Sequence, residues 1–381
     1  MSIYLDFNAT APIDPRVLDY MVEIYKTVYG NADSRTHDFG NYARTIVENA
    51  REEIAVLLGI KKDEIFFTSG ATESNNIVFQ GLKNYALKEK KKHIITTAIE
   101  HKAIIETAKF LQSEGFEVDF VKPDLSGRVS EKEIEKLMRN DTLLVSVMHV
   151  NNETGIIQPV QEIGEYLFDK DVFFHVDATQ SFGKLVPELK SLKYDMLSVS
   201  AHKIGGPQGI GALVLKKKDY RLPPVKGIMY GGAQEHGIRP GTIPVALVAA
   251  FGKACELVSR EYEQNLEDCI KIREELIRLL DSSGIEYEIN GDSSYSVPNT
   301  INLCFPGISS EALMLSTKQY CGISNGSACN SYSYKPSYVL SAMGLSEDKI
   351  EDSVRISWGP HSNIKVISEA FCKLLEVVKV I

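Results

Sequence analysis

The chain has 381 residues, of which 44% are hydrophobic and 24% are charged, a composition typical of a globular protein with room for two domains. Its net charge of −9 offers no general attraction to nucleic acid or to an anionic membrane, so we expect neither as a partner. The start, MSIYLDFNAT, lacks the pattern of a signal peptide, and no apolar run approaches the roughly 20 residues of a membrane span. A cytoplasmic location is therefore expected.

Six cysteines are scattered along the chain, at positions 255, 269, 304, 321, 329 and 372. No two of them have the Cys-x-x-Cys spacing, so neither a metal site nor a disulfide framework is predicted. Reduced thiols agree with a cytoplasmic protein.

Between residues 60 and 215, short apolar runs alternate with helical patterns. The strand candidates are 64–69, 93–99, 117–122, 142–150, 172–178, 196–201 and 210–215. The helix candidates between them include 72–90, 101–114, 131–139 and 159–170. Several strands are apolar throughout, which is typical of strands covered on both faces. The alternation predicts an α/β fold with a mostly parallel central sheet.

After Gly241 the pattern changes. A long helical stretch covers about 244–280, and strand candidates follow at 286–291, 299–305 and 352–358, mixed with helices near 310–320, 336–344 and 364–379. We therefore predict a large α/β domain over residues 15–255. A smaller α+β domain is expected to combine residues 1–14 with residues 256–381.

Asp177 and Lys203 give the strongest chemical signal. Asp177 ends the apolar strand VFFHVDA, and Lys203 lies in a small-residue turn after the strand MLSVSA. A carboxylate that keeps a pyridine nitrogen protonated and a lysine that forms a Schiff base are the two anchors of pyridoxal phosphate (PLP). Taken alone, Asp177 could cap a helix and most lysines are solvated surface residues. Together the two residues predict a PLP site.

Residues 69–73, SGATE, follow one strand candidate and precede a helix. A small-residue turn at a helix start directs free N–H groups outward and can hold a phosphate, to which Thr72 adds a hydroxyl. An ordinary helix cap is the alternative. Ser200 and His202 can donate to the same phosphate, and Gln180 can reach the phenolic oxygen of the ring.

His101 and Asn152 follow two further strands. A neutral imidazole can stack on a pyridine ring and move protons, although a lone histidine is more often structural. Asn152 can bind the phenolic oxygen or a substrate carboxylate. Because these two residues, Thr72, Asp177 and Lys203 all follow strand ends, we expect them in one site.

Cys329 and Arg355 complete the candidates. Residues 324–334 are almost all Ser, Asn, Gly, Ala and Tyr, so Cys329 is predicted to be an exposed, reactive thiol on a loop, with a spectator cysteine as the alternative. Cys304 lies among apolar neighbours and is predicted to be buried. Arg355 follows on a later strand, where a guanidinium can bind a substrate carboxylate through two hydrogen bonds or form a surface ion pair.

Eight segments resemble, in order, the motifs of the NifS/IscS-type cysteine desulfurases, which belong to the class V aminotransferase group of fold-type I PLP enzymes. They are YLDFNATAP, TSGATESNN, TAIEHKAI, VNNETGIIQP, HVDATQSFGK, SAHKIGGPQGIGAL, GGAQEHGIRPGT and NGSACNS. The resemblance extends from residue 4 to about residue 360. It departs from the family pattern at Ala201, often a glycine, and at Gly205, often bulkier.

The resemblance implies a role for each matching residue. Lys203 is similar to the Schiff-base lysine, Asp177 to the partner of the pyridine nitrogen, and His101 to the ring-stacking acid/base. The other matching positions bind the cofactor, its phosphate or the substrate, and these are Asn8, Ala71, Thr72, Asn152, Gln180, Ser200, His202 and Arg355. Thr242 matches a threonine that reaches the phosphate of the neighbouring subunit, which implies a homodimer. Cys329 matches the nucleophile that carries the persulfide.

The activity implied is conversion of L-cysteine to L-alanine, with the sulfur passed from Cys329 to an acceptor protein. The acceptor would serve iron-sulfur cluster assembly, tRNA thiolation or DNA phosphorothioation, and the form of residues 325–329, NGSAC, resembles the last group. No resident metal is expected, although Cys329 could be a transient iron-sulfur ligand. The alternatives are a selenocysteine lyase or another class V aminotransferase, and a PLP-bound scaffold that docks sulfur acceptors.

Overall fold

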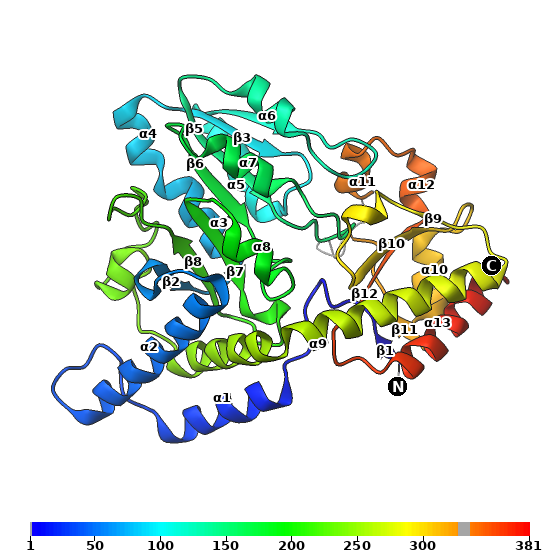
Figure 1. Ribbon diagram of the computed structural model, residues 1–381, viewed down its shortest axis with the longest axis horizontal. Coiled ribbons are helices and arrows are strands. Elements are labelled where there is room, and N and C mark those ends of the chain that lie inside the picture. The colour runs from blue at the N-terminus through cyan, green and yellow to red at the C-terminus, as the bar shows by residue number, and fades with distance from the viewer. Residues whose placement is uncertain (1, 327–335) are drawn as a thin grey trace.

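The computed structural model describes residues 2–326 and 336–381, and within them a seven-stranded sheet forms the centre of the larger part of the molecule (Figure 1). Its order is β2-β8-β7-β6-β5-β3-β4. The bounds are β2 (Ile65–Thr68), β3 (His93–Thr97), β4 (Glu117–Val121), β5 (Thr142–Met148), β6 (Phe173–Asp177), β7 (Met196–Ser200) and β8 (Gly211–Leu215). These are the seven predicted strands. All pairs from β4 to β7 are parallel, whereas β8 is antiparallel to both β7 and β2, so the mostly parallel sheet is confirmed.

Helices cover both faces of this sheet, as the apolar strands predicted. They are α3 (Ala71–Gly81), α4 (Lys83–Glu89), α5 (Lys102–Ser113), α6 (Glu131–Leu137), α7 (Val160–Leu167) and α8 (Val186–Ser191). Successive strand residues enter different cores: Ile94 packs in one hydrophobic cluster and Ile95 in another. Side chains alternate between the two faces of a strand, so a strand buried on both faces must be apolar throughout.

The first 60 residues contain two helices that the sequence analysis did not identify, α1 (Pro15–Thr27) and α2 (Asp38–Leu58). A side-chain oxygen of Asp14 accepts from the Arg16 N–H at 2.8 Å, and Pro15 opens α1. An acid followed by proline is a recognisable helix start. Both helices pack against α9 (Val245–Ser283), the long helix predicted at 244–280.

The smaller part of the molecule is built on the second half of α9 (Figure 1). It contains an antiparallel sheet, β12-β10-β9, of β9 (Glu288–Ile289), β10 (Thr300–Cys304) and β12 (Ser353–Ser357). The helices are α10 (Ser310–Thr317), α11 (Tyr338–Ala342), α12 (Glu347–Glu351) and α13 (Ile364–Val378). Strand β1 (Ile3–Tyr4) pairs in parallel with β11 (Cys321–Gly322). Because α9 crosses the predicted boundary at 255 without a break, the division into two domains stays a prediction.

Among the described residues, no helix combines the length and the apolar character needed to cross a membrane.

Candidate active site

A cavity of about 1140 Å³ opens at the carboxyl ends of the parallel strands, where α/β sheets bind their ligands. Eleven of the predicted site residues line it: Asn8, Ala71, Thr72, His101, Asn152, Asp177, Gln180, Ser200, His202, Lys203 and Arg355. Thr242 is not among the lining residues and lies exposed just before α9. Cys329 lies outside the described residues.

The turn between β2 and α3, predicted to hold a phosphate, lines the cavity. Gly70, the residue before the helix, has φ +153°, which only glycine adopts without strain. A Cβ on the neighbouring Gly211 would lie 2.7 Å from the Gly70 Cα, so glycine here also permits the close approach of β8. The first N–H groups of a helix have no intrahelical acceptor. Ala71 and Thr72 present that end of α3 to the cavity.

The last residue of β7, Ser200, and His202 in the turn that follows line the same cavity. Ser200 is buried, and the Nδ1 of His202 lies 3.1 Å from the Thr10 hydroxyl. Burial, followed by the charge of Lys203, lowers the pKa of His202 to about 4. The His202 imidazole is therefore neutral near pH 7, and one of its ring nitrogens carries a proton that it can donate.

Asp177 ends β6 as a buried carboxylate with a defined set of partners. Its Oδ1 accepts from the backbone N–H of Thr179 at 2.9 Å and from the Thr179 hydroxyl at 2.5 Å. Its Oδ2 accepts from the Asn75 amide at 2.8 Å. No lysine or arginine of the described part lies within ion-pair distance of it. A buried carboxylate without a counter-charge fits a cationic ligand group such as a protonated pyridine.

His101 caps α5 through its ring. The Nδ1 accepts from the Ala103 N–H at 3.2 Å, so the proton of the neutral imidazole lies on Nε2. Burial lowers the pKa of His101; the charge of Asp177 opposes this shift, and the charges of Lys203 and Lys102 add to it. The ring is consequently neutral near pH 7, as a ring that stacks and exchanges protons requires.

The Lys203 ammonium donates to two backbone carbonyls of the N-terminal segment, those of Asn8 at 2.5 Å and Ala9 at 2.7 Å. Burial lowers the pKa of Lys203 to about 7, and the positive charges of Lys184 and Arg355 contribute. An ordinary lysine has a pKa near 10.4 and is almost fully protonated at neutral pH. Lys203 therefore has a large neutral, nucleophilic fraction under the same conditions.

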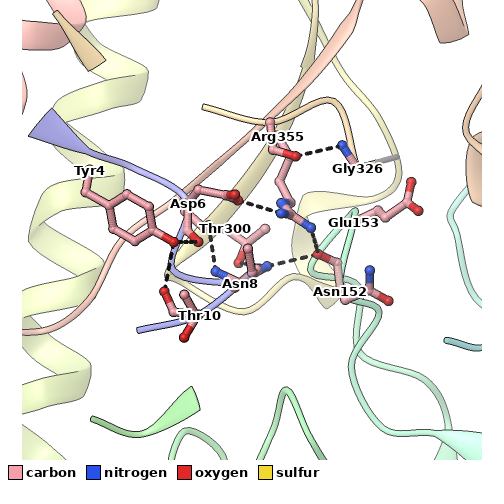
Figure 2. Close-up of polar contacts among 12 residues, drawn as sticks. Tyr4, Asp6, Asn8, Thr10, Asn152, Glu153, Thr300, Gly326 and Arg355 are labelled. Carbon is pink, nitrogen blue, oxygen red and sulfur yellow. Dashed lines mark hydrogen bonds and ion pairs between the residues drawn. The ribbon is translucent and has the colours of Figure 1, made fainter. Parts of the chain in front are cut away.

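Arg355 closes the side of the cavity formed by the smaller part of the molecule (Figure 2). Its guanidinium donates to the Asn152 carbonyl at 2.8 Å and to the Asp6 carboxylate at 2.5 Å. The Asn8 amide donates to the Thr300 hydroxyl at 2.9 Å and to the same Asn152 carbonyl at 3.2 Å.

Three polar atoms in this group are buried with no hydrogen-bond partner in the described structure: Arg355 Nε, Asn152 Oδ1 and Asn8 Oδ1. Such atoms are costly unless a ligand pairs with them. The three residues that carry these atoms line the cavity, and one donor with two acceptors suits the carboxylate and amine of an amino acid.

Sequence reasoning missed the partners that hold these groups, namely Asp6, Thr10, Asn75 and Thr179. Asp6 and Thr10 lie close to Asn8 in the chain, and Thr179 has the short spacing of an Asx turn to Asp177. Asn75 had no signal, because its contact with Asp177 joins residues that are 102 positions apart.

The family model for aminotransferase class-V matches residues 3–368. The chain belongs to this family. A cysteine desulfurase IscS from Vibrio vulnificus is 43% identical over 367 residues, which cover 94% of this chain and 88% of the relative. A solved NifS-like protein superposes with a TM-score of 0.91 at 35% identity, covering all of both chains. A solved SspA in complex with cysteine gives a TM-score of 0.84 at 36% identity, over 95% of this chain and all of the other.

The predicted membership of the NifS/IscS-type group and the fold-type I architecture are therefore confirmed. Enzymes of this family depend on PLP, and PLP is the cofactor of this chain. The cavity fits that cofactor, because it offers an uncompensated buried carboxylate, a lysine that is partly neutral at pH 7 and a helix start with free N–H groups.

Proposed function

We propose that the chain is a PLP-dependent cysteine desulfurase that converts L-cysteine to L-alanine and holds the released sulfur as a persulfide on Cys329. One observation carries the proposal: Lys203, Asp177 and His101 line a single cavity with Arg355, whose buried Nε has no partner in the described structure. The residues proposed for the cofactor and for the substrate carboxylate thus line one cavity.

In this proposal the described residues would hold PLP at its phosphate, its ring, its phenolic oxygen and its aldehyde carbon. The start of α3, with Ala71 and Thr72, would bind the phosphate together with Ser200 and His202. Asp177 would pair with the ring nitrogen, and His101 would stack on the ring. Gln180 and Asn152 would bind the phenolic oxygen, and Lys203 would form the covalent link.

Bound PLP supplies an electron sink for the pair released when the substrate α-carbon loses its proton. Arg355 orients the substrate through its carboxylate, and Asn8 and Asn152 offer their free amide oxygens to its amine. The Lys203 amine, neutral in part because of its low pKa, accepts the α-proton. His101, with its proton on Nε2, donates and accepts protons on the face of the ring it covers.

The sulfur step is assigned to Cys329. Its thiolate attacks the substrate sulfur, so that an S–S bond forms while the Cβ–S bond breaks. The electron pair of the broken bond goes to Cβ, which gains a proton and becomes the methyl group of alanine. No outside oxidant is needed. Cys304 and Cys321 are poor substitutes, because both are buried and burial raises the pKa of each thiol to about 11.

A sulfur-acceptor protein is the partner that this chemistry requires, because a persulfide must be discharged before the next turnover. The acceptor can belong to iron-sulfur cluster assembly, tRNA thiolation or DNA phosphorothioation, and the proposal places the reaction in the cytoplasm. Mass spectrometry of co-purified proteins after labelling with ³⁵S-cysteine identifies which acceptor receives the label.

A homodimer is also part of the proposal. Tyr29 and Phe39 are exposed, and their ring centroids lie 5.2 Å apart. Tyr230, 99% exposed, belongs to the loop before Thr242, and Gln234 of that loop donates to Asp33 at 2.9 Å. Exposed aromatic side chains of this kind are typical of an interface. Thr242 is exposed in the same loop, and its proposed role is to reach the phosphate of the neighbouring subunit.

Sedimentation tests the dimer. The Tyr29→Asp, Phe39→Asp double variant is expected to sediment as a monomer with the fold retained. Leu125→Asp, an equally exposed apolar position elsewhere, is expected to leave the dimer intact. A double variant that stays dimeric would remove these two residues from the interface.

The assay that tests the function compares the PLP-loaded protein with its Lys203→Ala variant. The unaltered protein is expected to release alanine from L-cysteine and to transfer one sulfur to a thiol acceptor for each alanine. The variant is expected to lose both the visible absorbance of the lysine-linked cofactor and the turnover. An unchanged spectrum in Lys203→Ala would refute the anchor assignment.

A further inference from the structure

A second lysine lies directly behind the candidate active site. Lys184 follows Gln180 in the series of turns between β6 and α8. It lines a separate, mostly apolar cavity of about 300 Å³ next to α9, and Lys203 lines both this cavity and the active-site cavity. None of the roles drawn from the motifs involves Lys184.

Hydrogen bonds join the two lysines. The Lys184 ammonium donates to Gln180 Oε1 at 3.2 Å, and Gln180 Nε2 donates to the Asn8 carbonyl at 2.9 Å. The Lys203 ammonium donates to that same carbonyl at 2.5 Å. Gln180 and the Asn8 backbone thus connect Lys184 to the proposed cofactor anchor.

This connection fixes the orientation of the Gln180 amide. An ammonium group has three donors and no acceptor, so the atom of Gln180 that faces Lys184 must be the carbonyl oxygen. The NH₂ group of Gln180 therefore points to Asn8 and the active site, with one of its two N–H bonds used. In that orientation Gln180 can only donate to a cofactor oxygen.

The charge of Lys184 also acts on Lys203. Burial lowers the pKa of Lys184 to about 8, and the amine stays mostly protonated at pH 7. No carboxylate of the described residues lies within ion-pair distance of it, and Arg355 opposes its charge. After burial itself, Lys184 is the largest contributor to the low pKa of Lys203.

Other charged groups also act on the two amines. Arg355 acts on Lys203 in the same direction as Lys184, whereas Asp6 and Asp177 oppose it. On the side of α9, burial raises the pKa of the Cys269 thiol to about 12, so this neighbour is uncharged near pH 7. The charged residues at the far wall of the small cavity pair with one another. Arg16 forms ion pairs with Glu261 at 2.6 Å and with Asp14 at 2.7 Å, and His361 lies 3.8 Å from Glu261.

We propose that Lys184 is a positioning residue: it orients the Gln180 amide toward the cofactor, and its charge disfavours a proton on the nitrogen of Lys203. The inference rests on the proposed function only in requiring that Lys203 carries PLP. It is independent of the sulfur chemistry on Cys329.

The test titrates the visible absorbance of the PLP-loaded dimer with pH, which reports the protonation of the Lys203 nitrogen. Removing a neighbouring positive charge favours the protonated form, so Lys184→Met is expected to raise the midpoint by about one pH unit. Lys184→Arg keeps the charge and is expected to keep the midpoint. Lys190→Met, an exposed lysine on the neighbouring α8, is the matched control and should change nothing.

Gln180→Glu provides a second route if Lys184→Met does not fold. A carboxylate at position 180 pairs with Lys184 and neutralises its field, so the midpoint is again expected to rise. A Gln180→Leu variant keeps the charge of Lys184 but loses the donor to the cofactor. It is expected to release PLP several-fold more readily on dialysis, with the midpoint little changed.

If the midpoint of the absorbance titration is unchanged both in a folded Lys184→Met variant and in Gln180→Glu, the inference is wrong. A rise of equal size in Lys184→Arg would do the same, because the charge is then not the cause. The spectrum of Lys203→Ala distinguishes failure of the proposed function from failure of this inference. If the visible band persists in Lys203→Ala, Lys203 is not the cofactor anchor. If that band is lost but the titration midpoint does not change in the Lys184 variants, only the role of Lys184 is wrong.

Discussion

The guanidinium of Arg355 lies 2.5 Å from the carboxylate of Asp6, although 349 residues separate them in the chain. Both side chains are largely buried, at 4% and 16% exposed. The pair joins the N-terminal segment to β12 and orients the arginine that faces the cavity (Figure 2). The structure of the proposed substrate site thus depends on Asp6, to which no reacting role is assigned.

Removing Asp6 should destabilise the fold. Asp6→Ala leaves the buried charge of Arg355 uncompensated, and we expect the free energy of unfolding to fall by about 3 kcal/mol. Urea unfolding measures the change. Glu133→Ala, which breaks an exposed pair with Lys136, is the control and should cost less than about 1 kcal/mol. If the free energy of unfolding falls equally in Asp6→Ala and Glu133→Ala, Asp6 does not hold Arg355 in place.

Arg355 should determine affinity for the carboxylate of the substrate. Arg355→Lys keeps a positive charge but loses the planar array of donors, so KM for L-cysteine is expected to rise about tenfold or more. Cysteamine lacks the carboxylate, and its weak inhibition should be the same in the variant and the unaltered protein. A KM that does not change would place the substrate carboxylate elsewhere.

The low pKa of Lys203 predicts how the apoprotein captures PLP. The neutral amine is the nucleophile, and it becomes protonated as pH falls through about 7. Capture should therefore be slow below pH 6, rise with a midpoint near pH 7 and level off above pH 8. Stopped-flow absorbance after mixing with PLP follows the reaction. A midpoint near pH 10, the value for an ordinary lysine, would contradict the pKa shift.

Asn75 should contribute to cofactor binding without touching the reacting atoms. It donates to Asp177 at 2.8 Å, and Asn75→Ala removes one of the bonds that fix that carboxylate. The expected effect is a PLP affinity about tenfold weaker, measured by dialysis and fluorescence. The control is Asn76→Ala, at the next position on α3. The Asn76 amide donates to the Thr72 carbonyl and accepts from the Gln80 side chain, and it makes no hydrogen bond to Asp177. If Asn75→Ala and Asn76→Ala lose PLP affinity to a similar extent, the effect belongs to α3 as a whole and not to the bond with Asp177.

The central sheet could be read from the sequence because each of its strands is a short apolar run between turn residues. Residues such as Lys203 and His101 were identifiable because they follow those runs directly. Helices α1 and α2 were not predicted, although Asp14-Pro15 is a recognisable start signal for α1.

The supporting residues could not be found in this way. Asp6, Asn75 and Lys184 act through partners in other elements, and a contact between distant positions leaves no periodic pattern in a single sequence. Motif resemblance indicated the residues that we propose for cofactor binding. It did not indicate which buried charges set their protonation.

Alanine release by a Cys329→Ser variant tests the central claim most directly. The PLP-loaded variant should keep the visible band of the unaltered protein and produce no alanine above background from L-cysteine, because the carbon–sulfur bond cannot break without a thiolate to receive the sulfur. Cys372→Ser, the partly exposed cysteine on α13, should form alanine at the unaltered rate. Alanine formed at that rate by Cys329→Ser would contradict the assignment of this chain as a desulfurase that works through Cys329.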